Sequence, residues 1–123
     1  MLLGIGTDIM KAERITTLPL EDKFFVRVFS DRERKQASQH HNPLRYYASH
    51  FSGKEAVFKA LSANPDHIRL NDIEILNMDT GIPTVALHGT AKQHALSIGI
   101  HKVLLSLSWE DEFCVAFAVA LSD

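Results

Sequence analysis

The chain has 123 residues, of which 46% are hydrophobic and 23% charged, a composition typical of one soluble globular domain. Its net charge of −2 at pH 7 gives no support to bulk nucleic-acid binding, which needs a basic surface. No apolar run approaches the ~18 residues of a membrane span, and Asp8 interrupts the first apolar run too early for a signal peptide. Cys114 is the only cysteine, so we expect a cytoplasmic protein without an internal disulfide.

The first half of the chain predicts one strand and two helices. Residues 1–9 are mostly apolar and predict a short strand. The segment 30–33 has the spacing of a capping box and predicts a helix over about 31–39. A longer helix should begin near Pro43, a favourable first-turn residue, and residues 64–66 (Asn-Pro-Asp) should end it.

The second half predicts two hairpins and one helix. The last two strands are almost wholly apolar, which is expected at the centre of a sheet covered on at least one face. We therefore predict an α+β fold, a single domain over residues 1–123, with an antiparallel sheet and the long helix packed on it. The expected elements are strands at 73–76 and 84–87, a helix at 90–98, and strands at 103–108 and 113–121, with a turn across 109–112.

The long helix carries charge where its apolar stripe should continue. Apolar residues recur at spacings of three and four over residues 44–61. Glu55 lies four residues after Phe51 and three before Phe58, so its side chain projects from the same face. An isolated buried carboxylate costs several kcal/mol, whereas an exposed Glu55–Lys59 pair returns only about 0.3–0.5 kcal/mol. The placement therefore indicates a function for the charge.

A second carboxylate, Asp8, stands at the end of the first strand. If the fold brings Asp8 and Glu55 within about 4 Å, their repulsion is about 4 kcal/mol at an effective dielectric constant of 20. Either one of them is then protonated or a cation lies between them. Two carboxylates and several waters describe a magnesium site that leaves positions free for substrate phosphates. Lys59, one turn after Glu55, would face the same place and could neutralise a phosphate oxygen.

Each of these residues also has a purely structural interpretation. Asp8 could be a turn or cap residue, and Glu55 with Lys59 could be an ion pair at the helix edge. Lys54 is expected to extend its stem over the apolar surface and keep its ammonium in water. Other chemistries are poorly supported, because the sequence has no His-x-x-x-His on an apolar face, no Gly-x-Ser-x-Gly elbow and no P-loop.

Together these motifs resemble those of the holo-acyl-carrier-protein synthase family, the small 4′-phosphopantetheinyl transferases. Residues 4–9 (Gly-Ile-Gly-Thr-Asp-Ile) look like the opening motif of that family. Residues 51–60 match its second motif, Phe-x-x-Lys-Glu-Ala-x-x-Lys-Ala. Residues 81–83 and 106–119 are similar to its two hairpins, so the resemblance spans nearly the whole chain in order.

The resemblance implies transfer of the 4′-phosphopantetheine arm of coenzyme A to a serine of an apo acyl carrier protein, releasing adenosine 3′,5′-bisphosphate. It implies that Asp8 and Glu55 hold magnesium and that Glu55 and Lys59 are catalytic. Either Glu55 or a metal-bound water would deprotonate the serine. Arg14 and Arg27 would face the acidic carrier protein.

The resemblance also implies contacts with coenzyme A and a homotrimer with active sites between subunits. The expected coenzyme A contacts are Lys59, His50, Pro83, Ser108 and Trp109. His50 stands where the family usually has arginine, and Ile82 occupies a position that is often basic. Trp109 replaces a common histidine, and it could stack on adenine or pack in the core. We therefore expect weaker discrimination for the 3′-phosphate than is usual in the family.

One further departure and two other functions remain open. Residues 62–64 (Ser-Ala-Asn) replace the usual glycine-rich end of the long helix. The alternative function is a non-catalytic trimeric relative that binds carrier proteins or nucleotides. A third interpretation is a structural oligomer whose ion pairs only set the register of its elements. Retention of Asp8, Glu55 and Lys59 together favours the enzyme.

Overall fold

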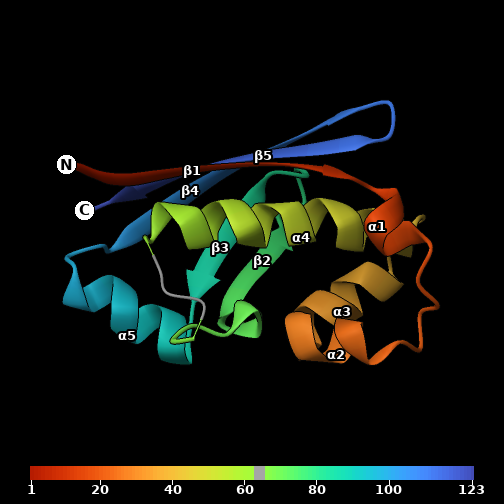
Figure 1. The fold of residues 1–123 in the computed structure, drawn as a ribbon, viewed down its shortest axis with the longest axis horizontal. Helices are drawn as coiled ribbons and strands as arrows, with labels where there is room; N and C mark the ends of the chain where they lie inside the picture. Colours follow the sequence, from red (N-terminus) through yellow and green to blue (C-terminus); the bar gives the residue numbers. More distant parts are fainter. Residues whose placement is uncertain (63–65) are drawn as a thin grey trace.

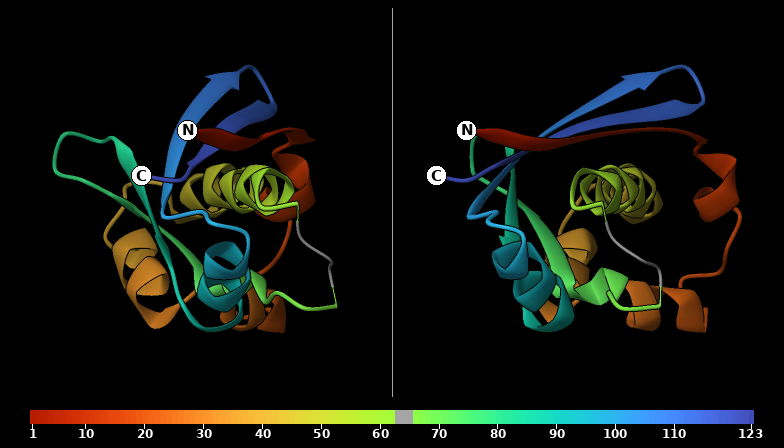
Figure 2. Two further views of the ribbon diagram at one scale, coloured as in Figure 1. Left: turned by 90° about the vertical axis from the view of Figure 1, so that its left-hand side faces the viewer. Right: turned by 60° about the vertical axis from the view of Figure 1, so that its left-hand side comes forward.

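Helix α4 (Pro43–Ala60) lies at the centre of the protein, with a sheet on one side and smaller elements on the other (Figures 1 and 2). The computed structural model of the protein describes residues 1–62 and 66–123. The strands are β1 (Leu2–Lys11), β2 (Ile73–Asn77), β3 (Pro83–Leu87), β4 (Lys102–Glu110) and β5 (Phe113–Leu121). The other helices are α1 (Glu13–Thr16), α2 (Lys23–Val28), α3 (Asp31–Ser38), the 3-10 helix η1 (Leu70–Asp72) and α5 (Gly89–Ser97).

The strands form two antiparallel sheets, which confirms the α+β class. The larger sheet has the order β1-β5-β4, and the smaller one is the hairpin β2-β3. Strand β5 is central, whereas β4 is an edge strand, so the expectation that both apolar strands are central is wrong for β4. In the part of the chain that the structure describes, no helix is long and apolar enough to cross a membrane.

Small residues cover the face of the larger sheet that packs on α4. On β5 this face carries Ala116, Ala118 and Ala120, all fully buried. On β1 it carries Gly4 and Gly6, which are in register with Ala120 and Ala118. Because these side chains are a methyl group or absent, the backbone of α4 approaches the sheet closely.

The glycines of β1 show how close this approach is. A Cβ atom on Gly6 would lie 1.9 Å from the carbonyl oxygen of Ala56, and one on Gly4 would lie 2.0 Å from that of Ala60. Asp8 is two residues after Gly6 and in register with Ala116, so its side chain lies on the same face. The glycine spacing therefore puts the Asp8 carboxylate against α4.

The opposite face of the larger sheet is apolar and exposed. Ile5 and Ile9 on β1 are 60% and 68% exposed, and Phe117 on β5 is 45% exposed. Leu104 on β4 continues this face, and Ser106 and Ser108 alternate with buried-side residues on the same strand. We call this surface, formed by Ile5, Ile9, Leu104, Ser106, Ser108 and Phe117, the outer sheet face.

Most elements with a clear sequence pattern occur where they are expected. The capping box at the start of α3 is present, with Ser30 and Glu33 bonding each other's backbone N–H groups. The last hairpin turns more tightly than expected, because β4 extends to Glu110. The short helices α1, α2 and η1 were not predicted. The expected helix end at 64–66 and the substitutions at 62–64 fall largely on residues 63–65, outside the described residues.

The two ends of the chain lie side by side (Figure 1). The terminal ammonium of Met1 donates to Ser122 Oγ at 2.9 Å. The N–H of Ser122 donates to the carbonyl of Met1, also at 2.9 Å. Strands β1 and β5 therefore stay paired to their outermost residues.

The approach of β1 to α4 can be tested by the substitution Gly6→Ala. We expect it to lower the free energy of unfolding by about 3 kcal/mol, because the added methyl group meets backbone atoms of α4 that cannot rotate away. Chemical denaturation monitored by circular dichroism measures this change. Gly81→Ala is the matched control.

The control separates steric contact from backbone strain. Gly81 has φ +88° but no atom within 4 Å of an added Cβ. Its substitution should cost about 1 kcal/mol, the strain of a left-handed backbone alone. Equal losses in the two variants would contradict close packing at Gly6.

Candidate active site

Asp8 lies between β1 and α4 with both carboxylate oxygens near donors from α4. The hydroxyl of Ser52 donates to Asp8 Oδ2 at 2.8 Å. The ammonium of Lys59 lies 3.6 Å from Asp8 Oδ1 and donates to the carbonyl oxygen of Thr7 at 2.9 Å. The structure thus brings Asp8 and Lys59 together, although they are far apart in sequence.

Glu55 lies on the same side of α4 and interacts electrostatically with Asp8. Burial raises the pKa of the Glu55 carboxyl, and the negative charge of Asp8 raises it further. The positive charges of Lys59 and Arg14 act in the opposite direction. Within the described residues Lys59 pairs with Asp8, and no ion pair within 4 Å joins it to Glu55. The alternative interpretation of Glu55 and Lys59 as an ion pair at the helix edge is therefore wrong, and Lys59 contacts β1 instead.

This pair of carboxylates suits a magnesium ion. Two like charges raise each other's free energy, and a divalent cation between them removes the repulsion. In residues 1–62 and 66–123 no group of three or more His, Cys, Asp or Glu side chains is arranged to hold a metal. Magnesium commonly takes only one or two carboxylates and completes its shell with water and substrate phosphates, so Asp8 and Glu55 fit that ion.

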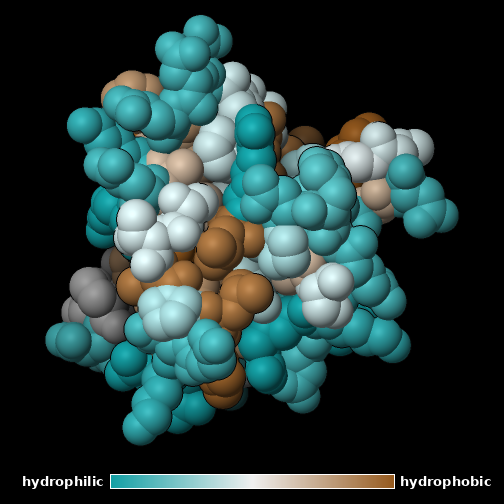
Figure 3. All heavy atoms as spheres, turned by 90° about the vertical axis from the view of Figure 1, so that its right-hand side faces the viewer, coloured by the Kyte–Doolittle hydropathy of each residue, from teal (hydrophilic) through white to brown (hydrophobic). Residues whose placement is uncertain are grey.

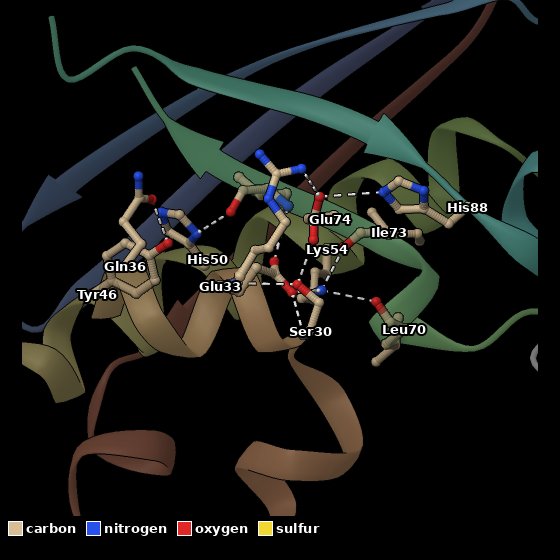
Figure 4. A network of polar contacts seen from close by, with 12 residues as sticks. Ser30, Glu33, Gln36, Tyr46, His50, Lys54, Leu70, Ile73, Glu74 and His88 are labelled. Atoms are coloured by element: carbon tan, nitrogen blue, oxygen red, sulfur yellow. Dashed lines mark hydrogen bonds and ion pairs between the residues drawn. The ribbon is translucent and has the colours of Figure 1, made fainter. Parts of the chain in front are cut away.

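Lys54, next to Glu55 in sequence, is fully buried, and the expectation that its ammonium reaches water is wrong. It forms an ion pair of 2.8 Å with Glu33 Oε1, and both side chains have no exposed area. It also donates to the carbonyl oxygens of Leu70, at 2.9 Å, and Ile73 (Figure 4). Burial lowers the pKa of Lys54, while the charge of Glu33 opposes that change.

Glu33 accepts the buried ammonium because the capping box of α3 fixes its carboxylate. Its Oε1 accepts from the backbone N–H of Ser30, and its Oε2 accepts from the backbone N–H of Ile75. The pair therefore joins α3, α4 and the start of β2 (Figure 4). Removing one partner of such a pair lowers the free energy of unfolding by roughly 3–5 kcal/mol, because the other charge stays buried without a partner. Lys54 thus fixes the helix that presents Glu55.

A cavity of about 350 Å³ lies beside the first half of α4, and three of the expected coenzyme A contacts line it. These are His50, Pro83 and Trp109. His50 is 1% exposed, and its ring nitrogens lie 3.0 Å from the carbonyl oxygen of Ile75 and from Asn77 Oδ1. Burial lowers the pKa of His50 to about 4. His50 is therefore neutral at pH 7 and does not replace the positive charge of an arginine.

Arg45 also lines this cavity, and the sequence reasoning missed it. Its guanidinium lies 4.0 Å from the ring centroid of Trp109, a cation–π contact. One face of Trp109 is thus covered by Arg45, while the residue also packs against the hydrophobic cluster around Tyr47. The sequence shows only an exposed arginine in the first turn of α4. Its partner Trp109 on β4 is 64 residues away, so local patterns could not predict the contact.

The remaining expected site residues lie on other surfaces. Ser108 is on the outer sheet face and points away from the cavity that Trp109 lines. Arg14 on α1 and Arg27 on α2 are exposed. Arg14 lies near enough to Glu55 to affect its pKa, whereas Arg27 has no such interaction with it. Within one chain the structure therefore brings together Asp8, Glu55, Lys59 and Arg14, but it does not bring Ser108 to them.

The substitution Asp8→Asn tests whether the two carboxylates interact. Because the charge of Asp8 raises the pKa of Glu55, its removal should lower that pKa toward the ordinary glutamate value. Carboxyl carbon NMR of the metal-free protein between about pH 2 and 8, a range that extends at least roughly two units on either side of an ordinary glutamate pKa, measures the titration. An unchanged titration of Glu55 would show that the two groups do not interact.

Comparison with known proteins finds relatives from one enzyme family that match nearly the whole chain. The sequence profile of the 4′-phosphopantetheinyl transferase superfamily matches residues 4–118. A holo-[acyl-carrier-protein] synthase of Natranaerobius thermophilus is 42% identical over 125 residues, which covers 100% of both chains.

Solved structures agree with the sequence comparison. The holo-[acyl-carrier-protein] synthase of Neisseria meningitidis superposes with a TM-score of 0.88 at 31% identity, covering 98% of this chain and 99% of that chain. The synthase of Bacillus anthracis in complex with CoA (3′,5′-ADP) superposes with a TM-score of 0.81 at 32% identity, covering 100% and 99%. The chain belongs to the holo-acyl-carrier-protein synthase family of 4′-phosphopantetheinyl transferases and is an enzyme of that transferase class.

Proposed function

We propose that this protein transfers the 4′-phosphopantetheine group of coenzyme A to a serine of an apo acyl carrier protein, in a magnesium-dependent reaction that releases adenosine 3′,5′-bisphosphate. The observation that carries the proposal is the meeting of Asp8, Glu55 and Lys59 where β1 packs on α4. Family membership supports coenzyme A and the carrier protein as the two substrates.

Asp8 and Glu55 are the residues that would hold the magnesium ion. When bound, this ion supplies positive charge that stabilises the pyrophosphate and the phosphate that leaves. Lys59 has a half-exposed side chain beside Asp8, so its ammonium can donate to a phosphate oxygen of coenzyme A. Its bond to the Thr7 carbonyl keeps the ammonium at the site before substrate arrives.

In the reaction the serine oxygen of the carrier protein forms a bond to the phosphorus that carries the pantetheine arm. The bond from that phosphorus to the oxygen of adenosine bisphosphate breaks, and the serine proton passes to Glu55 or to a water that it holds. In the metal-free protein, burial and the charge of Asp8 raise the pKa of the Glu55 carboxyl, whereas a bound cation would lower it again. The proton would therefore pass to whichever of Glu55 and a metal-bound water is then the stronger base. The residues thus act by positioning the phosphates and accepting one proton.

The carrier protein would approach at the end of the molecule formed by α1 and α2. Arg14 and Arg27 are exposed on these helices, and Leu20 and Val26 are exposed apolar residues next to them in the chain. The view of this end in Figure 3 shows apolar side chains surrounded by hydrophilic ones. Residues 11–28 contain four basic and three acidic side chains, so the positive excess is small and the proposed attraction to an acidic partner depends on Arg14 and Arg27 themselves.

We also propose that three copies assemble through the outer sheet face. Large apolar residues on this face, Ile5, Ile9 and Phe117 among them, would leave water when it is covered. Ser108 lies on the same face, so in an assembly it would face a second chain.

Incubation with apo acyl carrier protein, coenzyme A and magnesium tests the proposed reaction. The mass spectrum of the carrier should gain one phosphopantetheine group, and chelation of magnesium should prevent the gain. Glu55→Gln should lower the rate by about a thousandfold or more, because it removes one charge from a metal ligand that also serves the proton transfer.

Light scattering of the wild-type protein and of Glu55→Gln provides the control. Both should have the mass of three chains, and Glu55→Gln should have an unfolding midpoint no lower than that of the wild type, because it removes a charge that burial and Asp8 disfavour. The loss of activity would then be chemical. Unimpaired transfer by Glu55→Gln would remove Glu55 from the proposed mechanism, and a monomeric wild-type protein would contradict assembly through the outer sheet face.

The preference for coenzyme A over dephospho-coenzyme A tests the cavity around Trp109. His50 is neutral, so Arg45 is the lining residue that we expect to bind the 3′-phosphate through its positive charge. We expect a preference of about tenfold in kcat/KM, the value of one charged hydrogen bond, and we expect Arg45→Ala to abolish it. A preference of about a thousandfold, or one that survives Arg45→Ala, would require other cations at the 3′-phosphate.

A further inference from the structure

We propose that Ser52 is a positioning residue of the metal site: its hydroxyl holds the inner oxygen of the Asp8 carboxylate and leaves the outer oxygen for the cation. The inference rests on the proposed function, because it assigns a role toward a magnesium ion held by Asp8 and Glu55. It concerns a residue that the second motif of the family leaves unspecified, the first x after the phenylalanine.

Ser52 is fully buried and its hydroxyl has one partner, the Asp8 carboxylate. The Oγ–Oδ2 distance is 2.8 Å, and the bond joins residues that are 44 positions apart. Ser52 precedes Glu55 by three residues on α4, so both side chains lie on neighbouring turns of the same face. A neutral donor to one proposed ligand of the ion therefore lies about one turn of α4 before the other proposed ligand.

The two oxygens of Asp8 have different surroundings. Oδ2 accepts from the buried hydroxyl of Ser52, whereas Oδ1 lies 3.6 Å from an ammonium whose side chain is 54% exposed. The Asp8 side chain itself is 15% exposed. The hydroxyl of Ser52 thus occupies Oδ2 on the buried side, and it favours an orientation of the carboxylate plane in which the other oxygen lies toward the half-exposed Lys59.

Packing alone does not explain a serine at this position. Alanine forms helices better than serine and would fill nearly the same volume between α4 and β1. A serine inside a helix commonly bonds the carbonyl four residues earlier, but this hydroxyl bonds a carboxylate on another element. The hydroxyl therefore serves Asp8 and not the helix.

Hydrogen bonds to metal ligands orient them, and loss of one commonly lowers metal affinity by about 10–100-fold. We expect Ser52→Ala to weaken binding of Mn²⁺, used as a spectroscopic probe for the magnesium site, by a factor in this range. Electron paramagnetic resonance of free Mn²⁺ gives the affinity without any turnover. The apparent KM for Mg²⁺ in the transfer assay should rise in parallel, while kcat at saturating Mg²⁺ stays close to that of the wild type.

Ser52→Cys extends the series with a side chain of similar size and a weaker donor. Its Mn²⁺ affinity should lie between those of the wild type and Ser52→Ala. If Ser52→Ala does not fold, the cysteine variant decides the question: a reduced affinity supports the proposal and an unchanged one overturns it.

Thr90→Val is the matched control for loss of a hydroxyl–carboxylate bond. Thr90 Oγ1 donates to Asp72 Oδ2 at 2.6 Å, a bond between α5 and η1 that lies on the far side of α4 from the larger sheet (Figure 1). The same hydroxyl oxygen accepts from the N–H of Arg69 at 3.0 Å, so this control removes at least as many hydrogen bonds as Ser52→Ala. Removing this hydroxyl should lower the melting temperature but leave Mn²⁺ affinity unchanged. A purely structural role for Ser52 would make the two variants behave alike.

The outcomes separate this inference from the proposed function. If the wild type binds Mn²⁺ and transfers phosphopantetheine, and Ser52→Ala does so with unchanged affinity and KM for the metal, the positioning role is wrong and the enzyme assignment stands. If the wild type neither binds Mn²⁺ nor modifies the carrier, the proposed function fails and the role of Ser52 fails with it.

Discussion

The close approach of the β1 backbone to α4 places Asp8 beside the charged residues of that helix. Gly4 and Gly6 leave no side chain between the strand and the carbonyl groups of α4, and alanines of β5 continue this surface. Side chains of ordinary size would move the helix outward and separate Asp8 from the charged residues of α4. The opening glycines of the sequence thus position the candidate active site, although they carry no reactive group.

Helix α4 also separates two kinds of charge that are adjacent in the sequence. Lys54 points away from the larger sheet to Glu33 and the carbonyl groups before β2, where it is fully satisfied. Glu55 faces the Asp8 side with only partial compensation, so its pKa is raised. The buried pair holds the helix in place, and this rigidity lets the helix present an unfavourable carboxylate near a second one.

The sequence was sufficient for elements with a local signal. The capping box of Ser30 and Glu33 predicted the start of a helix, and apolar runs separated by turn residues predicted the strands. Asp8 and Glu55 were identified as candidate site residues because a charge on an apolar face costs free energy. These inferences need only the chemistry of neighbouring residues and, for the site, a resemblance that joins two distant motifs.

Contacts between distant residues were not predictable in this way. The burial of Lys54 depends on a carboxylate 21 positions earlier and on carbonyl groups that follow α4. Arg45 and Trp109 meet only because β4 passes beside the start of α4. Helices α1 and α2 are too short for a periodic pattern, so their existence is decided by the packing of the complete fold.

The adjacency of Met1 and Ser122 has a consequence for how this fold can be connected to other proteins. A polypeptide that enters at β1 and leaves after β5 does so at nearly one point, so the whole domain can occupy a surface loop of a larger host without stretching it. Because the ends are adjacent, a short peptide could also join them, and new chain termini could be placed in a distant turn. Such circular permutants would keep β1 and β5 paired while relocating both ends of the chain.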